Sequence, residues 1–195
     1  HLALVGADVG VVRRRQHRFH AGQRCRRNPE YPSTLHEYNI IGISRGHDGA
    51  LRFDFSRLDR YVETYLALGI DREIGVIGVL AAWDDDFGHP LTDHPDNIRL
   101  ACYDEATGCI TWLRTQAELG QYLAALRAHL MQRGWWDITL FLADEPSDAA
   151  LFRRRVDFLR SVCPGAKIKV PANRVDIVEP FLQDVNDWTP QLEGI

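Results

Sequence analysis

Apolar runs alternate with amphipathic segments from about residue 38 to the end of the chain. Continuous apolar runs of this length are typical of buried strands, and they lie at residues 38–44, 74–80, 138–142, 167–170 and around Val185. Between them, apolar residues recur with the period of a helix face, in segments that follow Ser56 and that surround Leu119, Leu151 and residues 175–182. The pattern therefore predicts strands that alternate with helices.

Helix-end signals support these boundaries. Ser56 and Ser147 are predicted N-caps, because their hydroxyl groups can accept hydrogen bonds from the first free backbone N–H groups of a helix. Gly69 and Gly134 stand where the first two helices are expected to end.

Strands that are apolar throughout and alternate with helices indicate a parallel sheet covered by helices. No glycine-rich phosphate-binding loop follows any strand, so we predict an α/β fold of the (β/α)-barrel type rather than a nucleotide-binding fold. A complete barrel needs about 250 residues, and this chain of 195 residues predicts only about five core strands. We therefore expect a partial barrel over residues 38–195, preceded by an N-terminal flank over 1–37.

An incomplete barrel leaves strand edges unpaired, which promotes aggregation. We accordingly expect the 195-residue polypeptide alone to be insoluble or inactive. The chain opens on His1 rather than Met, and we expect its native N-terminus to be missing.

The segment between residues 84 and 113 interrupts the alternation. Its Pro, Asp and His residues predict a long loop, and residues 98–103 and 109–113 predict a hairpin around the turn 105–108. Cys102 and Cys109 flank that turn. A disulfide across the hairpin is one interpretation, and free thiols are the default interpretation.

Composition and charge exclude some classes of protein. The net charge of −4 argues against a general nucleic-acid binder, and no run approaches the roughly 20 apolar residues of a membrane-spanning helix. Residues 12–27 carry seven arginines without any helix or strand period. A basic arm that contacts phosphate is one interpretation, but a disordered flank or a sequence read in the wrong frame is favoured.

Asp144 and Glu145 are the strongest candidates for chemistry. They stand directly after the apolar run 138–142, where a desolvated carboxylate must be paired, hydrogen-bonded or protonated. In a barrel, catalytic residues follow the carboxyl ends of strands. Pro146 favours a bend that lets both carboxylates serve one pocket, with one ionised and the other neutral, as acid/base catalysis requires.

The competing interpretation of this pair is structural. Asp144 and Glu145 then only cap the following helix and pair with Arg153 or Arg154.

Three stretches, 54–62 (DFSRLDRYV), 129–135 (HLMQRGW) and 142–148 (LADEPSD), resemble the catalytic domain of glycoside hydrolase family 123 and the related domain of unknown function 4091. The similarity extends from about residue 38 to the C-terminus. It implies a (β/α) barrel and a β-N-acetylgalactosaminidase-like activity on terminal 2-acetamido sugars. We expect no cofactor and no metal.

The resemblance also implies a retaining, substrate-assisted mechanism, in which the acetamido oxygen of the sugar attacks the anomeric carbon. Carried over to this sequence, Glu145 protonates the leaving oxygen and later activates water, while Asp144 orients the acetamido N–H. The alternative function is a catalytically silent carbohydrate-binding barrel domain.

Other residues near the expected strand ends are candidates for binding the sugar. Trp83 and Trp188 are predicted to stack on sugar rings at the barrel mouth, and Asn173 to hydrogen-bond a hydroxyl. Core packing and a turn role are the competing interpretations. The acidic and histidine residues between 84 and 94 match no metal-ligand spacing, so we interpret them as a solvated loop. His129, on a predicted helix, is expected to be structural.

Overall fold

The computed structural model describes residues 40–77, 79–80, 100–143, 146, 148–172 and 179–190, and the backbone of three short strands at 2–5, 89–90 and 97–98. Its strands are β1 (Leu2–Val5), β2 (Gly42–Arg45), β3 (Leu51–Asp54), β4 (Ile74–Ile77), β5 (His89–Pro90), β6 (Asn97–Ile98), β7 (Ala101–Asp104), β8 (Cys109–Trp112), β9 (Thr139–Leu142), β10 (Lys167–Ala172) and β11 (Asp187–Pro190). Its helices are α2 (Ser56–Ala67), α3 (Gln116–Gln132) and α4 (Ala149–Val162), with short 3-10 turns η2 (Trp136–Ile138) and η3 (Glu179–Phe181).

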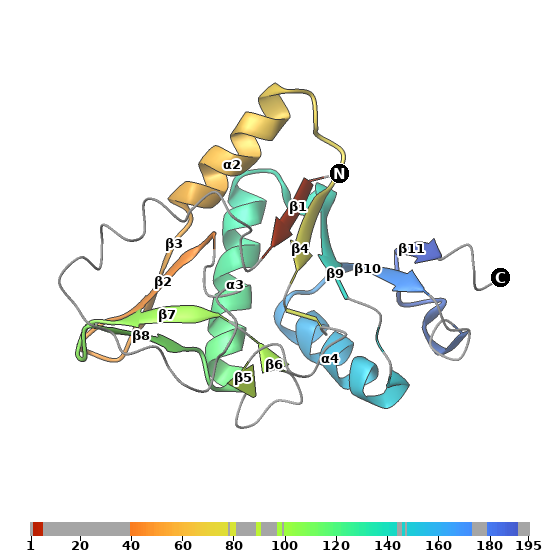
Figure 1. Cartoon of the computed structure of the whole chain (residues 1–195). Helices are drawn as coiled ribbons and strands as arrows, with labels where there is room; N and C mark the ends of the chain where they lie inside the picture. Colours follow the sequence, from red (N-terminus) through yellow and green to blue (C-terminus); the bar gives the residue numbers. More distant parts are fainter. Residues whose placement is uncertain are drawn as a thin grey trace.

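A five-stranded sheet in the order β1-β4-β9-β10-β11 forms the centre of the molecule, and every neighbouring pair in it is parallel. Val76, Phe141 and Ile168 lie side by side across three of these strands. All three are buried and belong to the same hydrophobic core as the apolar faces of α3 and α4, which stand beside the sheet in Figure 1. The alternation of strands and helices predicted from the apolar pattern is confirmed.

A second sheet, in the order β3-β2-β7-β8, consists of two antiparallel hairpins joined by the parallel pair β2–β7. Figure 1 shows α3 between this sheet and the large one. The predicted hairpin around residues 105–108 is β7–β8. Gly108 in its turn has φ +65°, a conformation that glycine adopts without steric cost.

The strand expected over residues 38–44 is β2, and it belongs to the small sheet rather than to the parallel one. Gly49, with φ +77°, closes a tight turn by donating its N–H to the carbonyl of Gly46 (2.8 Å). The chain therefore reverses at once into β3, which pairs antiparallel with β2. β1 also lies outside the expected strands, since residues 1–37 were predicted to be a flank.

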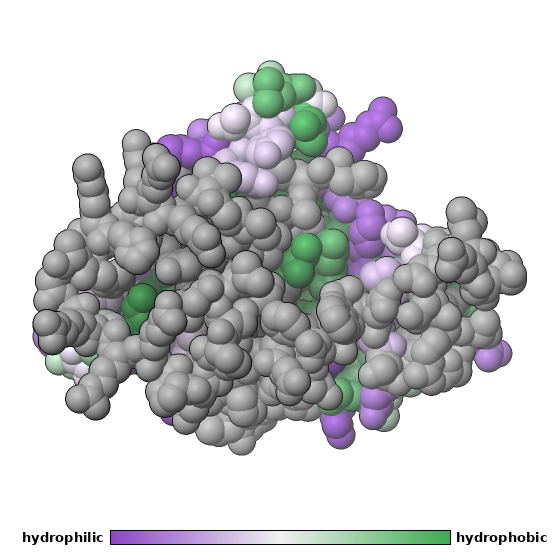
Figure 2. Space-filling view, in the orientation of Figure 1, coloured by the Kyte–Doolittle hydropathy of each residue, from purple (hydrophilic) through white to green (hydrophobic). Residues whose placement is uncertain are grey.

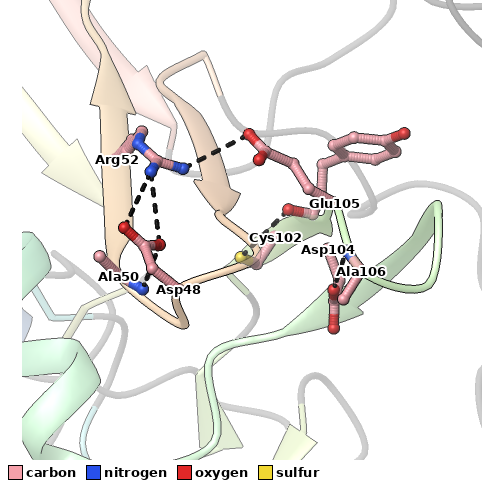
Figure 3. Close-up of polar contacts among 8 residues, drawn as sticks. Asp48, Ala50, Arg52, Cys102, Asp104, Glu105 and Ala106 are labelled. Carbon is pink, nitrogen blue, oxygen red and sulfur yellow. Dashed lines mark hydrogen bonds and ion pairs between the residues drawn. The ribbon is translucent and has the colours of Figure 1, made fainter.

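Polar contacts tie the two hairpins of the small sheet together (Figure 3). The guanidinium of Arg52 on β3 lies 3.1 Å from a carboxylate oxygen of Asp48 in its own turn, and 3.5 Å from Oε1 of Glu105 in the β7–β8 turn. The backbone N–H of Glu105 donates to the carbonyl of Arg45 (2.9 Å). These contacts fix the parallel β2–β7 pair, which no short loop connects.

The helix caps differ in part from the sequence prediction. The N–H of Ser56 donates to Oδ1 of Asp54 (2.9 Å), so Asp54, and not the Ser56 hydroxyl, supports the start of α2. The N-cap of α4 is Asp148, whose Oδ1 accepts from the N–H of Leu151 (2.9 Å), whereas Ser147 lies outside the described residues. A carboxylate at these positions also interacts favourably with the helix dipole.

The predicted helix ends are confirmed at Gly69 (φ +78°) and Gly134 (φ +72°). Leu68, just before Gly69, is 71% exposed, and Figure 2 shows hydrophobic atoms on the surface at this end of α2. Of the expected helix over 175–182, only η3 is described; residues 173–178 lie outside the described part.

The fold class is α/β, as predicted, whereas the described strands do not form a closed barrel, so the barrel remains a prediction. Cys102, Cys109 and Cys163 are free thiols. Cys102 lies opposite Thr111 and Cys109 opposite Asp104, so the hairpin does not pair the two cysteines. In the described part of the chain, no helix is both long and apolar enough to cross a membrane.

Candidate active site

The carboxyl ends of β4, β9, β10 and β11 meet at one edge of the large sheet, because these strands are parallel. In α/β sheets, ligands bind at this edge, where the loops leave the strands. β9 ends at Leu142 at this edge, and Asp144 and Glu145 follow in the sequence after one residue, Ala143. The two carboxylates themselves lie outside the described residues, as do Trp83 and Asn173.

The residues on both sides of the carboxylate pair are anchored. Ala143, which follows β9, is 1% exposed, and its N–H donates to the carbonyl of Lys169 on β10 (3.0 Å). Pro146 is buried, and Asp148 then begins α4. The residue before the pair and the residue after it are thus both buried.

α4 carries Arg153, one of the two arginines predicted as alternative partners of the pair; the other is Arg154. The guanidinium of Arg153 lies 2.6 Å from Oδ2 of Asp184 and 2.9 Å from the carbonyl of Pro180. Arg160, two turns further along α4, lies 2.7 Å from Oδ1 of the same Asp184. Arg153 is thus engaged in holding the η3–β11 segment against α4.

The same contacts affect the charge of Asp184. Burial raises the pKa of Asp184, but hydrogen bonds from Arg153 and Arg160, together with their positive charges, outweigh burial and hold this pKa below its usual range. Asp184 therefore stays ionised and keeps its contacts with both arginines of α4. Because β11 begins three residues after Asp184, these contacts also hold the start of β11 near α4.

Trp188 lies within β11, opposite Val170, and not beyond the last strand as predicted. Its half-buried indole packs against the hydrophobic core, because a strand position opposite the fully buried Val170 faces the same side of the sheet. The indole Nε1 is buried and has no hydrogen-bond partner among the residues that the structure describes.

A cluster of three charges lies on the other face of the sheet. Nζ of Lys169 is 3.0 Å from Oε2 of Glu73, which immediately precedes β4, and 2.9 Å from Oδ2 of Asp187 on β11. Burial lowers the pKa of Lys169, but hydrogen bonds to Asp187 and Glu73 outweigh burial and raise this pKa above its usual value. The ammonium of Lys169 therefore stays protonated at neutral pH.

The comparison with family models decides the affiliation of the chain. Residues 4–194 match the model described as glycoside hydrolase 123, catalytic domain. The chain belongs to this family. The match begins near the N-terminus, inside the region that the sequence alone did not relate to the family, and it includes the last two residues of β1.

A solved structure agrees with the family 123 assignment. A family 123 glycoside hydrolase from Clostridium perfringens, studied for glycolipid glycan hydrolysis, matches with a TM-score of 0.63 and 21% sequence identity. The match covers 80% of this chain and 27% of that chain, so this chain spans about a quarter of the solved protein. No curated protein sequence matches the chain.

Sequence reasoning missed the three charges around Lys169. A signal was present: Lys167 and Lys169 alternate with apolar residues in a strand that is otherwise buried, and a charge on such a strand requires partners. The partners are 96 residues away in the case of Glu73, so spacing alone does not identify them. Within the described residues, no three histidine, cysteine or acidic side chains gather as metal ligands do.

Proposed function

We propose that this family 123 domain carries the acid and the charge stabiliser of a retaining glycoside hydrolase that acts on terminal 2-acetamido sugars of the β-N-acetylgalactosaminide type. The observation that carries the proposal is the place of Asp144 and Glu145 in the chain of a family 123 domain. They follow the anchored residue Ala143 at the carboxyl edge of a parallel sheet, where α/β enzymes hold their substrates.

In the first step, the carbonyl oxygen of the 2-acetamido group attacks the anomeric carbon of the same sugar. The bond between this carbon and the leaving oxygen breaks, and the neutral carboxyl of Glu145 gives its proton to that oxygen. Asp144 accepts a hydrogen bond from the acetamido N–H and stabilises the positive charge of the oxazolinium intermediate.

In the second step, the carboxylate of Glu145 removes a proton from a water molecule, which attacks the anomeric carbon from the face that the leaving group occupied. The bond to the acetamido oxygen breaks and the amide is restored. Two inversions give net retention of configuration, and no part of the protein is covalently modified.

The two carboxylates need different protonation states for these roles. A helix N-terminus stabilises a nearby negative charge, and α4 begins at Ala149, after its cap Asp148. We propose that Asp144 remains ionised for this reason, whereas Glu145, more desolvated, is neutral when the substrate binds. We propose three further residues as contacts to the sugar. Trp83 and Asn173 follow β4 and β10 in the sequence, and Trp188 belongs to β11.

The test is hydrolysis of a chromogenic N-acetyl-β-galactosaminide by the natural gene product that contains this chain. Glu145→Gln is expected to lower kcat by about 10²- to 10⁴-fold, and Asp144→Asn by about 10²- to 10³-fold. Asp157→Asn, an exposed change on α4, is the control and is expected to keep full activity.

Unchanged activity in Glu145→Gln contradicts the acid/base role. Binding of the sugar without turnover by the unaltered protein contradicts hydrolysis altogether and supports the alternative, a silent carbohydrate-binding domain.

A further inference from the structure

Lys169 connects its own strand to three other strands of the large sheet. It lies on β10, its carbonyl accepts the N–H of Ala143 at the end of β9, and its ammonium contacts Glu73 at the start of β4 and Asp187 on β11. The bond from Ala143 is the last strand-to-strand hydrogen bond before the chain enters Asp144 and Glu145. Lys169 therefore connects the carboxylate-bearing strand end to the strands around it.

The charged cluster is costly to keep in this place. The side chains of Lys169 and Glu73 are 15% and 12% exposed, and charges at such positions lose most of their hydration. Replacing a buried ion pair with apolar side chains of similar volume is often neutral or stabilising. Asp187 is 42% exposed, and apolar side chains in place of these three charges would not join β4, β10 and β11 through directed contacts.

We propose that Lys169 is a positioning residue for the segment that carries Asp144 and Glu145. Its ammonium, held between Glu73 and Asp187, fixes the register of β10 against β4 and β11. Its carbonyl accepts the hydrogen bond from the N–H of Ala143. The register of β10 therefore also sets the position of Ala143, the residue before the carboxylate pair. The functional meaning of this role rests on the proposed hydrolysis, whereas the positioning itself does not.

Loss of the cation has a defined physical consequence. Without the ammonium, two carboxylates from β11 and from the start of β4 are left on one face of the sheet without their shared cation, and each must recover water. β4 and β11 then separate at this level, β10 shifts between them, and the hydrogen bond from Ala143 to Lys169 opens more often.

Lys167 provides a matched control on the same strand and face. It lies two residues before Lys169, and its ammonium donates to the backbone carbonyl of Asp137 rather than to a carboxylate. Lys167→Met removes an equal charge at nearly the same place, but leaves the cluster intact. Lys169→Arg keeps the cation and its ability to bridge two carboxylates.

The decisive measurement is amide hydrogen exchange at Ala143, with the amide of Leu123 in α3 as a reporter of global opening. In Lys169→Met we expect exchange at Ala143 to be about tenfold faster relative to Leu123, whereas Lys169→Arg and Lys167→Met stay within about threefold of the unaltered chain. If Lys169→Met does not fold, Glu73→Gln replaces it in the test, because this substitution keeps the volume of the side chain. In Glu73→Gln we expect exchange at Ala143 to be about threefold to fivefold faster relative to Leu123.

Unchanged relative exchange at Ala143 in Lys169→Met, or an equal increase in Lys167→Met, overturns the inference. In an active protein, Lys169→Met is expected to lower kcat about tenfold with KM within about twofold, and Lys169→Arg to restore kcat. Absence of hydrolysis in the unaltered protein contradicts the proposed function alone, because the exchange measurement needs no substrate.

Discussion

Nε2 of His129 on α3 lies 2.6 Å from Oδ1 of Asp59 on α2, and the ring of Phe55 stacks on the imidazole with centroids 4.2 Å apart. Asp59 and His129 are 70 residues apart in the chain. They belong to two of the three stretches that resemble family 123. The contact lies near the end of α3 that leads through η2 into the amino end of β9, whereas the carboxylate pair follows the carboxyl end of that strand.

The Asp59–His129 contact is expected to stabilise the fold. Asp59→Ala leaves a largely buried imidazole without its acceptor, and we predict a loss of about 1–2 kcal/mol in the free energy of unfolding. Urea denaturation measures this change. Asp157→Ala, at an exposed site on α4, is the control and is expected to change the free energy by less than about 0.5 kcal/mol. Equal effects of the two substitutions contradict a specific contact between α2 and α3.

The Asp184 cluster predicts a pH dependence of stability. Because Arg153 and Arg160 hold the pKa of Asp184 below its unfolded value of 3.8, the cluster stabilises the fold above that value and loses its effect as pH falls through the folded pKa. Asp184→Asn is therefore expected to be less stable than the unaltered chain at about pH 7, with a difference that shrinks below about pH 4.

Urea denaturation midpoints across this pH range test the prediction, and Asp157→Asn is the exposed control. A deficit in Asp184→Asn that is equally large at low and neutral pH contradicts the role of the ionised carboxylate.

Gly120 within α3 and Gly134, which follows the C-cap of α3, give opposite predictions for the same substitution. At Gly120, a methyl group meets Phe158 and Val162 at an ordinary 3.8 Å, so Gly120→Ala is expected to stabilise the helix by about 0.5–1 kcal/mol. At Gly134, which has φ +72°, Gly134→Ala is expected to cost about 1 kcal/mol or more, because the left-handed conformation is strained for alanine. Thermal midpoints that move in the same direction for both contradict this assignment of the helix end.

Thiol labelling distinguishes the three described cysteines. Burial raises the pKa of Cys102 and of Cys163 to about 11, whereas Cys109 is exposed. In a chain in which Cys25 is replaced by serine, we predict that one thiol, Cys109, reacts quickly with a disulfide reagent at about pH 8, since the thiolate is the reactive form. Cys109→Ser is expected to remove this fast reaction. Rapid labelling of Cys102 or Cys163 in the folded chain contradicts their burial.

Local patterns in the sequence predicted the elements well. The helix period around Leu119 and Leu151 corresponds to α3 and α4, and the turn residues 105–108 to the β7–β8 hairpin. These features depend on residues close together in the chain, through side-chain periodicity and turn conformation. The pair Asp144-Glu145 was likewise visible as two charges after an apolar run.

Features that depend on distant residues could not be predicted. An apolar run identifies a strand but not its neighbour, so β2 was not assigned to a second sheet. Trp188 was placed beyond the last strand because strand ends are poorly marked by sequence. The partners of Lys169 come from two other segments, and only the folded sheet brings Glu73 and Asp187 to one ammonium.

The central claim is that the 2-acetamido group of the substrate takes part in the chemistry while Glu145 moves the protons. The most direct test compares two aryl β-galactosides that differ only in this group, one with 2-acetamido and one with 2-hydroxyl, on the natural gene product that contains the chain. We predict turnover of the acetamido compound with release of the β-anomer, observed by NMR before mutarotation, and kcat/KM at least about 10³-fold lower for the hydroxyl compound. Equal turnover of both compounds, or release of the α-anomer, contradicts the account.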